Sequence, residues 1–340
     1  MSNNKDNVLL NVKDLKVKFP IFGGIFLRKV AEVKAVDGVS FSIKQGETLG
    51  LVGESGSGKS TIGKAILNVL EITAPDVEVS GEVNLLNLSS VGSTDLLSLT
   101  KRELHPHRRD VQMIFQDPFS SLNPRMTVGK IIQEPLDIHE KDMSEKEKKK
   151  KVGWLLEKVG LSAEQATRYP HEFSGGQRQR IGIARSLATN PRLIIADEPV
   201  SALDVSIQAQ VINLMQDLQR EFNLTFIFIA HDLSVVEHLS NRIAVMYLGN
   251  IVEIGDADAV YRNAKHPYTR SLLSAVPLPD PKGRGKERQV LQGDIPSPLA
   301  KPSGCGFRTR CPQAKPECGE KIPEYKKFDN DHLSACPYTD

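Results

Sequence analysis

Cysteine is missing from most of this 340-residue chain, and the few that occur lie at its C-terminal end. They are Cys305, Cys311, Cys318 and Cys336. Cysteines used for core packing would be scattered, because a free thiol packs like a small apolar side chain. In a reducing compartment, an even and segregated set indicates metal binding before disulfide formation.

Long apolar runs and an excess of one charge are also missing. The chain has no run of about 18 apolar residues, so it predicts no membrane-spanning helix. The N-terminus, MSNNKDNVLL, lacks the apolar core of a signal peptide. The formal net charge of +2 predicts no general attraction to nucleic acid. We therefore expect a cytosolic chain that meets a membrane only through partner proteins.

The chain does contain a glycine-rich loop, GESGSGKST, at 53–61. It fits G-x-x-x-x-G-K-[ST], and the flanking segments 47–52 and 61–70 predict the buried strand and the helix that this pattern requires. Glycines let backbone N–H groups turn toward phosphate oxygens, and the helix N-terminus adds partial positive charge. We expect Lys59 to reach the β/γ-phosphates and Ser60 to bind Mg²⁺. The predicted nucleotide-binding residues of the loop are Gly53, Glu54, Ser55, Gly56, Ser57, Gly58, Lys59, Ser60 and Thr61.

Apolar patterns elsewhere predict a mixed α/β fold. Strands are expected at 8–19, 38–52, 77–86, 111–115, 192–197 and 224–231, with a hairpin at 242–256. Helices are expected at 127–138, 144–161, 174–188 and 205–222. We expect a loop at 20–34 and a linker at 277–304. Strands alternating with helices imply a mostly parallel sheet covered on both faces.

Further motifs follow the loop in a fixed order. They are Gln116 in FQDP, FSGGQ at 173–177, Asp197 and Glu198 in LIIADEP, SALD at 201–204, and His231. The ordered set resembles the ATP-binding cassette (ABC) ATPases over roughly residues 8–265. This resemblance implies a P-loop NTPase with a RecA-like parallel-sheet core, an antiparallel β subdomain and a helical subdomain at about 117–190.

The residue types support catalytic roles for these motifs. Asp197, at the end of an apolar strand, can hold Mg²⁺, and Glu198 can act as general base toward the attacking water. Gln116 offers an amide that can contact both Mg²⁺ and that water. His231 can hydrogen-bond the γ-phosphate. Each residue alone has a structural explanation, and the ordered set favours the catalytic one.

The SGGQ motif predicts a second anion site, because two glycines before a helix expose N–H groups at its positive end. A single chain already has one phosphate loop. The resemblance implies that this motif faces the γ-phosphate bound to a second ATPase subunit, in a head-to-tail dimer with two ATP molecules between the subunits. Ser201 and Asp204 would lie at that interface. The motif residues assigned to nucleotide are Ser174, Gly175, Gly176 and Gln177.

Adenine recognition is less sharply indicated. ABC ATPases usually stack an aromatic side chain on the base, and Phe19 lies at a matching place in the chain. Phe22 and Phe26 are close rivals, and ordinary strand packing explains Phe19 equally well.

Two longer segments resemble a narrower group. FQDPFSSLNPRMTVGKIIQEPL at 115–136 and HPYTRSLLSAVPLPDP at 266–281 resemble the oligopeptide/dipeptide importer ATPases, and so does the later stretch at 293–318. The opening, with KAVDGVSF and the insertion before it, resembles the F-type subunit. In that group a related ATPase pairs with the chain beneath two membrane permease subunits. An extracytoplasmic peptide-binding protein delivers the peptide to these permeases. The resemblance thus implies a peripheral location at the cytoplasmic face of the membrane and no nucleic-acid partner.

The cysteine spacing leaves the metal open. The gaps are five, six and seventeen residues, and no pair has the tight C-x₂-C spacing of a zinc knuckle. Four thiolates suit tetrahedral Zn²⁺ or a [4Fe–4S] cluster, and a metal-free tail is the third alternative. The group resemblance favours the cluster.

The sequence thus predicts an ABC ATP-binding domain at 1–265 and an importer-type C-terminal extension at 266–340. The expected activity is hydrolysis of ATP to ADP and phosphate, coupled to import of oligopeptides or dipeptides. The alternatives are an importer for another solute, such as nickel or an oligosaccharide, and a soluble ABC ATPase without a transport role.

Overall fold

The computed structural model describes residues 7–24, 28–86, 92–275 and 293–339. The chain divides into two compact units. The first comprises Met1–Leu9, Ile43–Thr48 and Ser98–Ile229. The second comprises Leu10–Ser42, Leu49–Leu97 and Ala230–Asp340. Within the described ranges, no helix combines the length and apolar character needed to cross a bilayer.

The first unit contains a parallel sheet and a group of helices. Its strands are β6 (Val111–Ile114), β7 (Leu193–Asp197) and β8 (Thr225–Ala230), with β7 pairing in parallel with both neighbours. Its helices are α3 (Lys101–His107), α4 (Val128–His139), α5 (Glu145–Lys158), α6 (Gly175–Leu187) and α7 (Val205–Phe222), with 3₁₀ turns at Ala163–Thr167 and Pro170–Glu172. Every residue of β7 and β8 is buried, which explains their unbroken apolar sequences.

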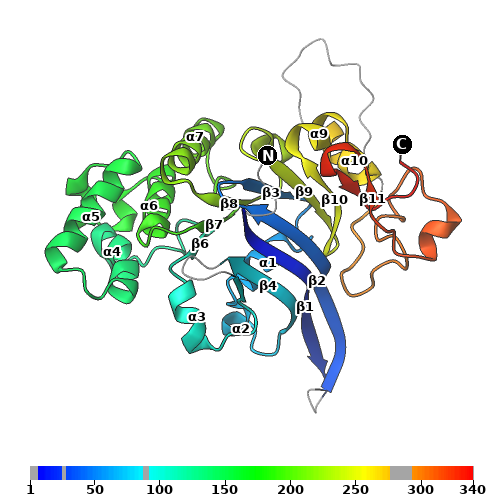
Figure 1. The fold of residues 1–340 in the computed structure, drawn as a ribbon, viewed down its shortest axis with the longest axis horizontal. Coiled ribbons are helices and arrows are strands. Elements are labelled where there is room, and N and C mark those ends of the chain that lie inside the picture. Colours follow the sequence, from blue (N-terminus) through cyan, green and yellow to red (C-terminus); the bar gives the residue numbers. More distant parts are fainter. Residues whose placement is uncertain (1–6, 25–27, 87–91, 276–292, 340) are drawn as a thin grey trace, which may run out of the picture. The chain divides into compact units, whose positions relative to one another are not determined.

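Helices α4, α5 and α6 pack on one another, and Figure 1 draws them in green. Helix α5 begins with a capping box in which Ser144 and Glu147 exchange hydrogen bonds. The lysine run in α5 is mainly exposed, except for the buried Lys148, whose ammonium lies 2.7 Å from Asp137 of α4. The indole of Trp154 on α5 meets the Phe222 ring of α7 edge-on at a centroid distance of 5.7 Å.

The second unit contains two sheets. An antiparallel sheet has the order β2-β1-β4-β5, formed by Arg28–Lys44, Val8–Gly23, Glu78–Leu86 and Ser93–Asp95. The other sheet runs β11-β12-β10-β9-β3 within this unit, formed by Lys326–Lys327, Leu333–Ser334, Asn250–Asp256, Arg242–Tyr247 and Thr48–Val52. Strand β3 pairs in parallel with β9, and the other pairings in this sheet are antiparallel.

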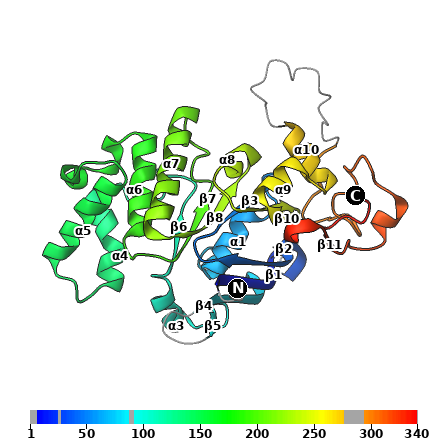
Figure 2. The same ribbon diagram turned by 45° about the horizontal axis from the view of Figure 1, so that its top comes forward.

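The helices of the second unit are mostly short. They are α1 (Lys59–Ile66), α2 (Leu70–Thr73), α8 (Leu233–Glu237), α9 (Ala257–Arg262) and α10 (Pro267–Ala275), with 3₁₀ turns at Pro316–Gly319 and Asp329–Asp331. Figure 2 shows α9 beside β10, which it contacts. Strand β12 is held by a buried pair in which His332 Nε2 lies 2.6 Å from Glu253 Oε1.

The predicted strands and helices are confirmed, with three corrections. The segment predicted as strand at 38–52 is divided into the end of β2 and the whole of β3, which belong to different sheets. The predicted loop at 20–34 is wrong, because β1 continues to Gly23 and β2 begins at Arg28, and Lys18 on β1 pairs with Glu32 on β2 across the strands. The helix predicted at 61–70 begins earlier, at Lys59, and ends at Ile66. It stops there because Asn68 adopts a left-handed φ of 51°. Residues 277–292 of the predicted linker lie outside the described residues.

Candidate nucleotide-binding and hydrolysis site

The phosphate loop joins the fully buried strand β3 to helix α1, as predicted. Gly53 and Gly58 have φ values of 150° and 105°, which side-chain-bearing residues rarely adopt. A Cβ added at Gly53 would lie 2.2 Å from the Met246 carbonyl oxygen, and one at Gly58 would lie 2.2 Å from that of Ala35. Both positions therefore require glycine for two independent reasons, namely the positive φ and the lack of space for a Cβ.

The ammonium of Lys59 is enclosed by its own loop. Only 4% of this residue is exposed, and its Nζ donates to the carbonyl oxygens of Gly53 at 2.7 Å and Glu54 at 3.0 Å. Ser60 and Thr61 lie in the first turn of α1, where backbone N–H groups have no intrahelical acceptor. A buried cation and a helix N-terminus at one loop form a site for phosphate.

Contacts from the C-terminal region reach this loop, and the sequence did not predict them. The Glu54 carboxylate accepts two hydrogen bonds from the Arg310 guanidinium, at 2.7 and 3.0 Å. The Glu54 N–H donates to the Tyr268 hydroxyl at 2.9 Å. No local sequence signal could have found these partners, because they lie 256 and 214 residues from Glu54.

The predicted catalytic residues Gln116 and Glu198 meet within the first unit. Asp197 is buried at the end of β7, and Glu198 follows it with a φ of 45°. This left-handed conformation is uncommon for a non-glycine residue and persists only where surrounding contacts hold it. Gln116 Nε2 donates to Glu198 Oε2 at 2.8 Å. The side-chain amide therefore holds the carboxylate that is predicted to act as general base.

The backbone around Glu198 is also fixed. Its N–H donates to the Ile229 carbonyl at 3.0 Å, and its own carbonyl accepts from Ser201 Oγ at 3.0 Å. Ser201 therefore lies next to the turn that carries Glu198. His231 is exposed and follows directly after β8, whose Ile229 is the register partner of Asp197. His231 and the phosphate loop belong to the second unit, and Gln116, Asp197 and Glu198 belong to the first.

The SGGQ motif forms the N-terminus of α6, as predicted. The Ser174 hydroxyl accepts from the Gln177 N–H at 3.3 Å, and the Gln177 side chain accepts from the Ser174 N–H at 3.0 Å. This capping box holds an exposed serine and two partly exposed glycines at the positive end of a 13-residue helix.

Asp204, the last residue of the SALD motif, occupies the N-cap position directly before α7. An N-cap aspartate usually accepts a hydrogen bond from its own helix, but the Asp204 side chain makes no capping hydrogen bond. The residue is exposed, and so is the next one, Val205, at 81%. An exposed valine beside an exposed carboxylate is consistent with the predicted interface with a second subunit.

The aromatic residues proposed for adenine lie on or near β1. Phe19 is half-buried within this strand, and Phe22 is exposed. Phe26 lies outside the described residues. The choice between adenine stacking and strand packing therefore stays a prediction.

All the cysteines line a single cavity of about 400 Å³ in the second unit. Burial raises the pKa of the Cys305, Cys311 and Cys336 thiols, and nearby cysteines raise it further. Within the described part of the chain, no three His, Cys, Asp or Glu side chains lie close enough together to hold a metal ion.

Backbone N–H groups point at the cysteine sulfurs. The N–H of Lys315 donates to Cys318 Sγ at 3.5 Å. Hydrogen bonds from the backbone of Phe307, Gln313 and Tyr338 lower the pKa of Cys305, Cys311 and Cys336, against the larger effect of burial. Hydrogen bonds to sulfur favour the thiolate form, which is the form that binds a metal.

Comparisons with known proteins agree with this geometry. Residues 36–201 match the ABC transporter family, and residues 252–318 match the family described as oligopeptide/dipeptide transporter, C-terminal region. The oligopeptide transport ATP-binding protein AppF of Bacillus subtilis is 53% identical over 99% of both chains. The oligopeptide transport ATP-binding protein OppF of Escherichia coli is 54% identical over 93% of this chain and 92% of its own.

A solved structure supports the same assignment. The dimeric post-hydrolysis state of the ATP-binding cassette MJ0796, bound to ADP and Pi, is 29% identical and has a TM-score of 0.60. The match covers 73% of this chain and 99% of that chain. The fold and the phosphate loop thus define an ABC-type ATPase, with the predicted mixed α/β architecture. More narrowly, the chain belongs to the family of oligopeptide transport ATP-binding proteins, and both relatives carry the F designation that its opening segment predicted.

Proposed function

We propose that this chain is the ATP-hydrolysing subunit that energises import of oligopeptides or dipeptides through a membrane ABC transporter. The observation that carries the proposal is the hydrogen bond between Gln116 and Glu198 in a chain that also has a complete phosphate loop. A chain that only bound ATP would not need a positioned general base. The oligopeptide/dipeptide match at 252–318 and the names of the relatives support peptides as the cargo.

The active unit is a head-to-tail pair with a related ATPase subunit. Two features support this arrangement, namely the SGGQ loop and Asp204, whose side chain makes no capping hydrogen bond to its own helix. Each presents polar groups outward. Ser174, Gly175, Gly176 and Gln177 would contact the γ-phosphate on the partner's phosphate loop. The dimeric form of the MJ0796 cassette is consistent with such a pair.

Contact with two permease subunits places the chain at the cytoplasmic face of the membrane. The segment after Gln116, roughly 117–140, is the proposed contact, and its Phe119 is 64% exposed. The Arg178 guanidinium lies 3.7 Å from the Phe119 ring centroid, which fixes this exposed aromatic on the first unit. An extracytoplasmic peptide-binding protein would supply the cargo.

The transport function is tested by co-purification and reconstitution. The full chain is purified from membranes with its bound proteins, which are identified and rebuilt into liposomes. We expect a second ATPase and two permeases, and ATP hydrolysis that rises when a peptide-loaded binding protein is added. Stimulation by another solute would overturn the peptide assignment, and a complex without permeases would overturn the transport role.

The permease contact is tested by cysteine cross-linking. A cysteine at Phe119 should cross-link to a cytoplasmic loop of a permease, with a yield that changes when ATP is added. A cysteine at the exposed Ile322 of the extension serves as the control. Cross-links from Ile322 alone would mean that the coupling surface is misplaced.

We further propose that the cysteine cavity holds a [4Fe–4S] cluster bound by Cys305, Cys311, Cys318 and Cys336. Four thiols with backbone N–H donors are a suitable ligand set for it. Two cationic residues, Arg308 and Lys321, and two acidic residues, Glu317 and Glu324, also line the cavity, so its charged side chains carry no net charge.

The cluster would order the extension, and no redox step is needed for that role. Anaerobically purified protein should be brown and contain about four irons per chain. Stoichiometric zinc without iron would overturn the cluster. A protease-resistant extension without metal would overturn both metals.

A further inference from the structure

The C-terminal extension makes a direct ionic contact with the phosphate loop, in addition to its cysteine cavity. Arg310 is buried, and its guanidinium holds both oxygens of the Glu54 carboxylate, at 2.7 and 3.0 Å. A bidentate pair of this kind fixes orientation as well as distance. The pKa of Arg310 is raised, chiefly by its hydrogen bonds to Glu54.

Aromatic packing determines where Arg310 lies. Phe307 is 1% exposed, and its ring meets that of Tyr247 edge-on at 5.3 Å. Tyr268 packs on both rings, at centroid distances of 4.7 Å from Tyr247 and 5.3 Å from Phe307. The Arg310 guanidinium lies 5.9 Å from the Tyr247 ring centroid. The aromatic cluster thus holds both groups that contact Glu54, namely the Arg310 guanidinium and the Tyr268 hydroxyl.

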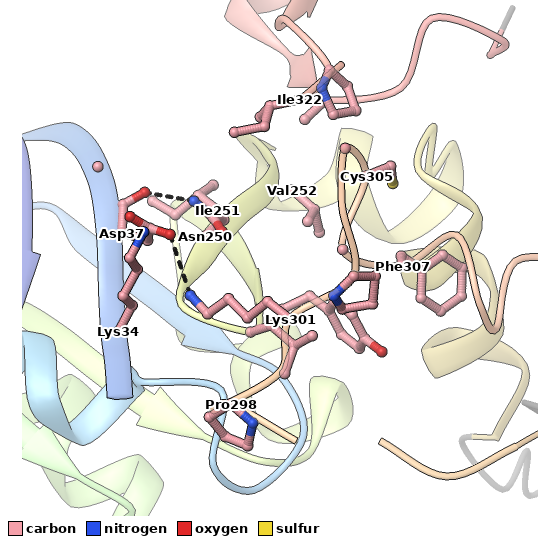
Figure 3. A pocket seen from close by; sticks show the side chains of 18 of the residues that line it. Lys34, Asp37, Asn250, Ile251, Val252, Pro298, Lys301, Cys305, Phe307 and Ile322 are labelled. Atoms are coloured by element: carbon pink, nitrogen blue, oxygen red, sulfur yellow. Dashed lines mark hydrogen bonds and ion pairs between the residues drawn. The ribbon is translucent and has the colours of Figure 1, made fainter. Parts of the chain in front are cut away.

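A second connection reaches the loop from the same extension. Lys301 pairs with Asp37 at 3.4 Å, as Figure 3 shows. The Asp37 N–H donates to the Gly249 carbonyl, and the Gly249 N–H donates to the Ser57 carbonyl, both at 2.9 Å. Residues 295–298 also line a cavity of about 270 Å³ together with Glu54–Ser57. The extension therefore borders the phosphate loop along several of its residues.

We infer that Arg310 and Tyr268 are positioning residues for ATP binding, and that the C-terminal extension is part of the nucleotide site. Neither residue needs to touch ATP. They fix Glu54, which follows Gly53 in the loop, and so hold the loop in the shape that presents its N–H groups to phosphate. Without these contacts the loop would have to be ordered by the nucleotide itself, which weakens binding. The inference rests on the ATP site alone and does not depend on the cargo or the metal.

The test compares Arg310→Gln with Arg308→Gln in the full chain. Arg308 lies in the same segment and lines the cysteine cavity, but it donates to the Ser303 carbonyl at 2.9 Å. We expect Arg310→Gln to weaken Mg-ATP affinity about tenfold, and Arg308→Gln to leave it within about twofold. Affinity is measured by titration with a fluorescent ATP analogue. Metal content and the melting temperature without nucleotide are recorded for each variant.

A double-mutant cycle with Glu54→Gln separates positioning from a general structural role. In the Glu54→Gln background, Arg310→Gln should lower Mg-ATP affinity by less than about a further twofold, because the partner of Arg310 is already changed. Arg310→Lys should restore part of the affinity, since it keeps the charge but not the bidentate geometry. The inference would be overturned if Arg310→Gln lowered Mg-ATP affinity equally with and without Glu54→Gln. It would also be overturned if Arg308→Gln lowered the affinity as much as Arg310→Gln.

Discussion

The phosphate loop and the SGGQ loop are both glycine-rich turns at a helix N-terminus, but they need glycine for different reasons. In the phosphate loop, Cβ atoms at Gly53 and Gly58 would each lie 2.2 Å from a backbone oxygen of the same chain. In the SGGQ loop, a Cβ at Gly176 would meet only the Ile207 side chain, at 2.5 Å, and one at Gly175 would make an ordinary contact of 3.6 Å.

This difference shows for which loop the chain's own contacts explain the glycines. The phosphate loop encloses its own lysine and has no room for a Cβ at Gly53 or Gly58, so contacts within its own chain dictate its form at both ends. Gly175 has room for a side chain, and its φ is not in the left-handed region. Its small size is therefore not explained by its own chain and is consistent with a partner subunit approaching from outside.

Replacing the proposed general base should have the largest effect. It removes a group needed for hydrolysis and leaves both glycine-rich loops unchanged. Glu198→Gln should lower ATP hydrolysis about 10²–10⁴-fold while ATP affinity stays unchanged. Single-turnover hydrolysis at the mutant site, with the partner's site inactivated, measures the effect. Asp217→Asn on α7 is the matched control, because this exposed carboxylate forms an ion pair with Arg220 of its own helix. Near-normal turnover in Glu198→Gln would contradict the role.

Gly58→Ala should damage the phosphate loop itself. The added Cβ overlaps the Ala35 carbonyl, and the φ of 105° is unfavourable for alanine. We expect ATP affinity of the free subunit to fall more than about tenfold, as measured by nucleotide titration. Gly182→Ala on α6 is the control, because a Cβ there meets nothing within 4 Å. Equal affinities for the two variants would show that the loop geometry is not required.

Gly175→Asp should affect the assembled pair but not the free subunit. A carboxylate there would oppose the partner's γ-phosphate, so we expect about a tenfold lower ATPase rate in the complex. Gly176→Asp should act in the same way, but its Cβ would also overlap Ile207, so Gly175 gives the cleaner test. If ATP affinity of the isolated subunit fell by the same factor, the SGGQ loop would serve its own chain's site.

The smallest effect on ATP is expected from the cysteine cavity. Cys311→Ser should abolish iron binding and loosen the extension to proteolysis. It should also weaken ATP affinity, by about threefold, because Cys311 is adjacent to Arg310. Thr309→Ser, at an exposed neighbouring position, should keep both iron and affinity. Loss of iron with intact protease resistance would show that the metal does not order the extension.

Much of this site is predictable from the sequence, because its parts are local. The phosphate loop and the strand ending at Asp197 have short-range patterns that the structure reproduces. The meeting of Gln116 with Glu198 follows from the ends of two neighbouring parallel strands, β6 and β7. The Arg310–Glu54 contact has no such pattern, since the folded chain alone brings these residues together. The long β1–β2 pair was missed because glycines and aromatics at 20–34 resemble a loop.

The packing of Trp154 gives the molecule a natural optical probe. It is the only tryptophan in the chain, is 38% exposed, and contacts Phe222 while the Lys158 ammonium lies 5.5 Å from its ring centroid. Because indole emission depends on solvent contact and nearby charge, intrinsic fluorescence reports the contact between α5 and α7 without any label. The effect of added nucleotide on this contact can therefore be followed in the unmodified protein.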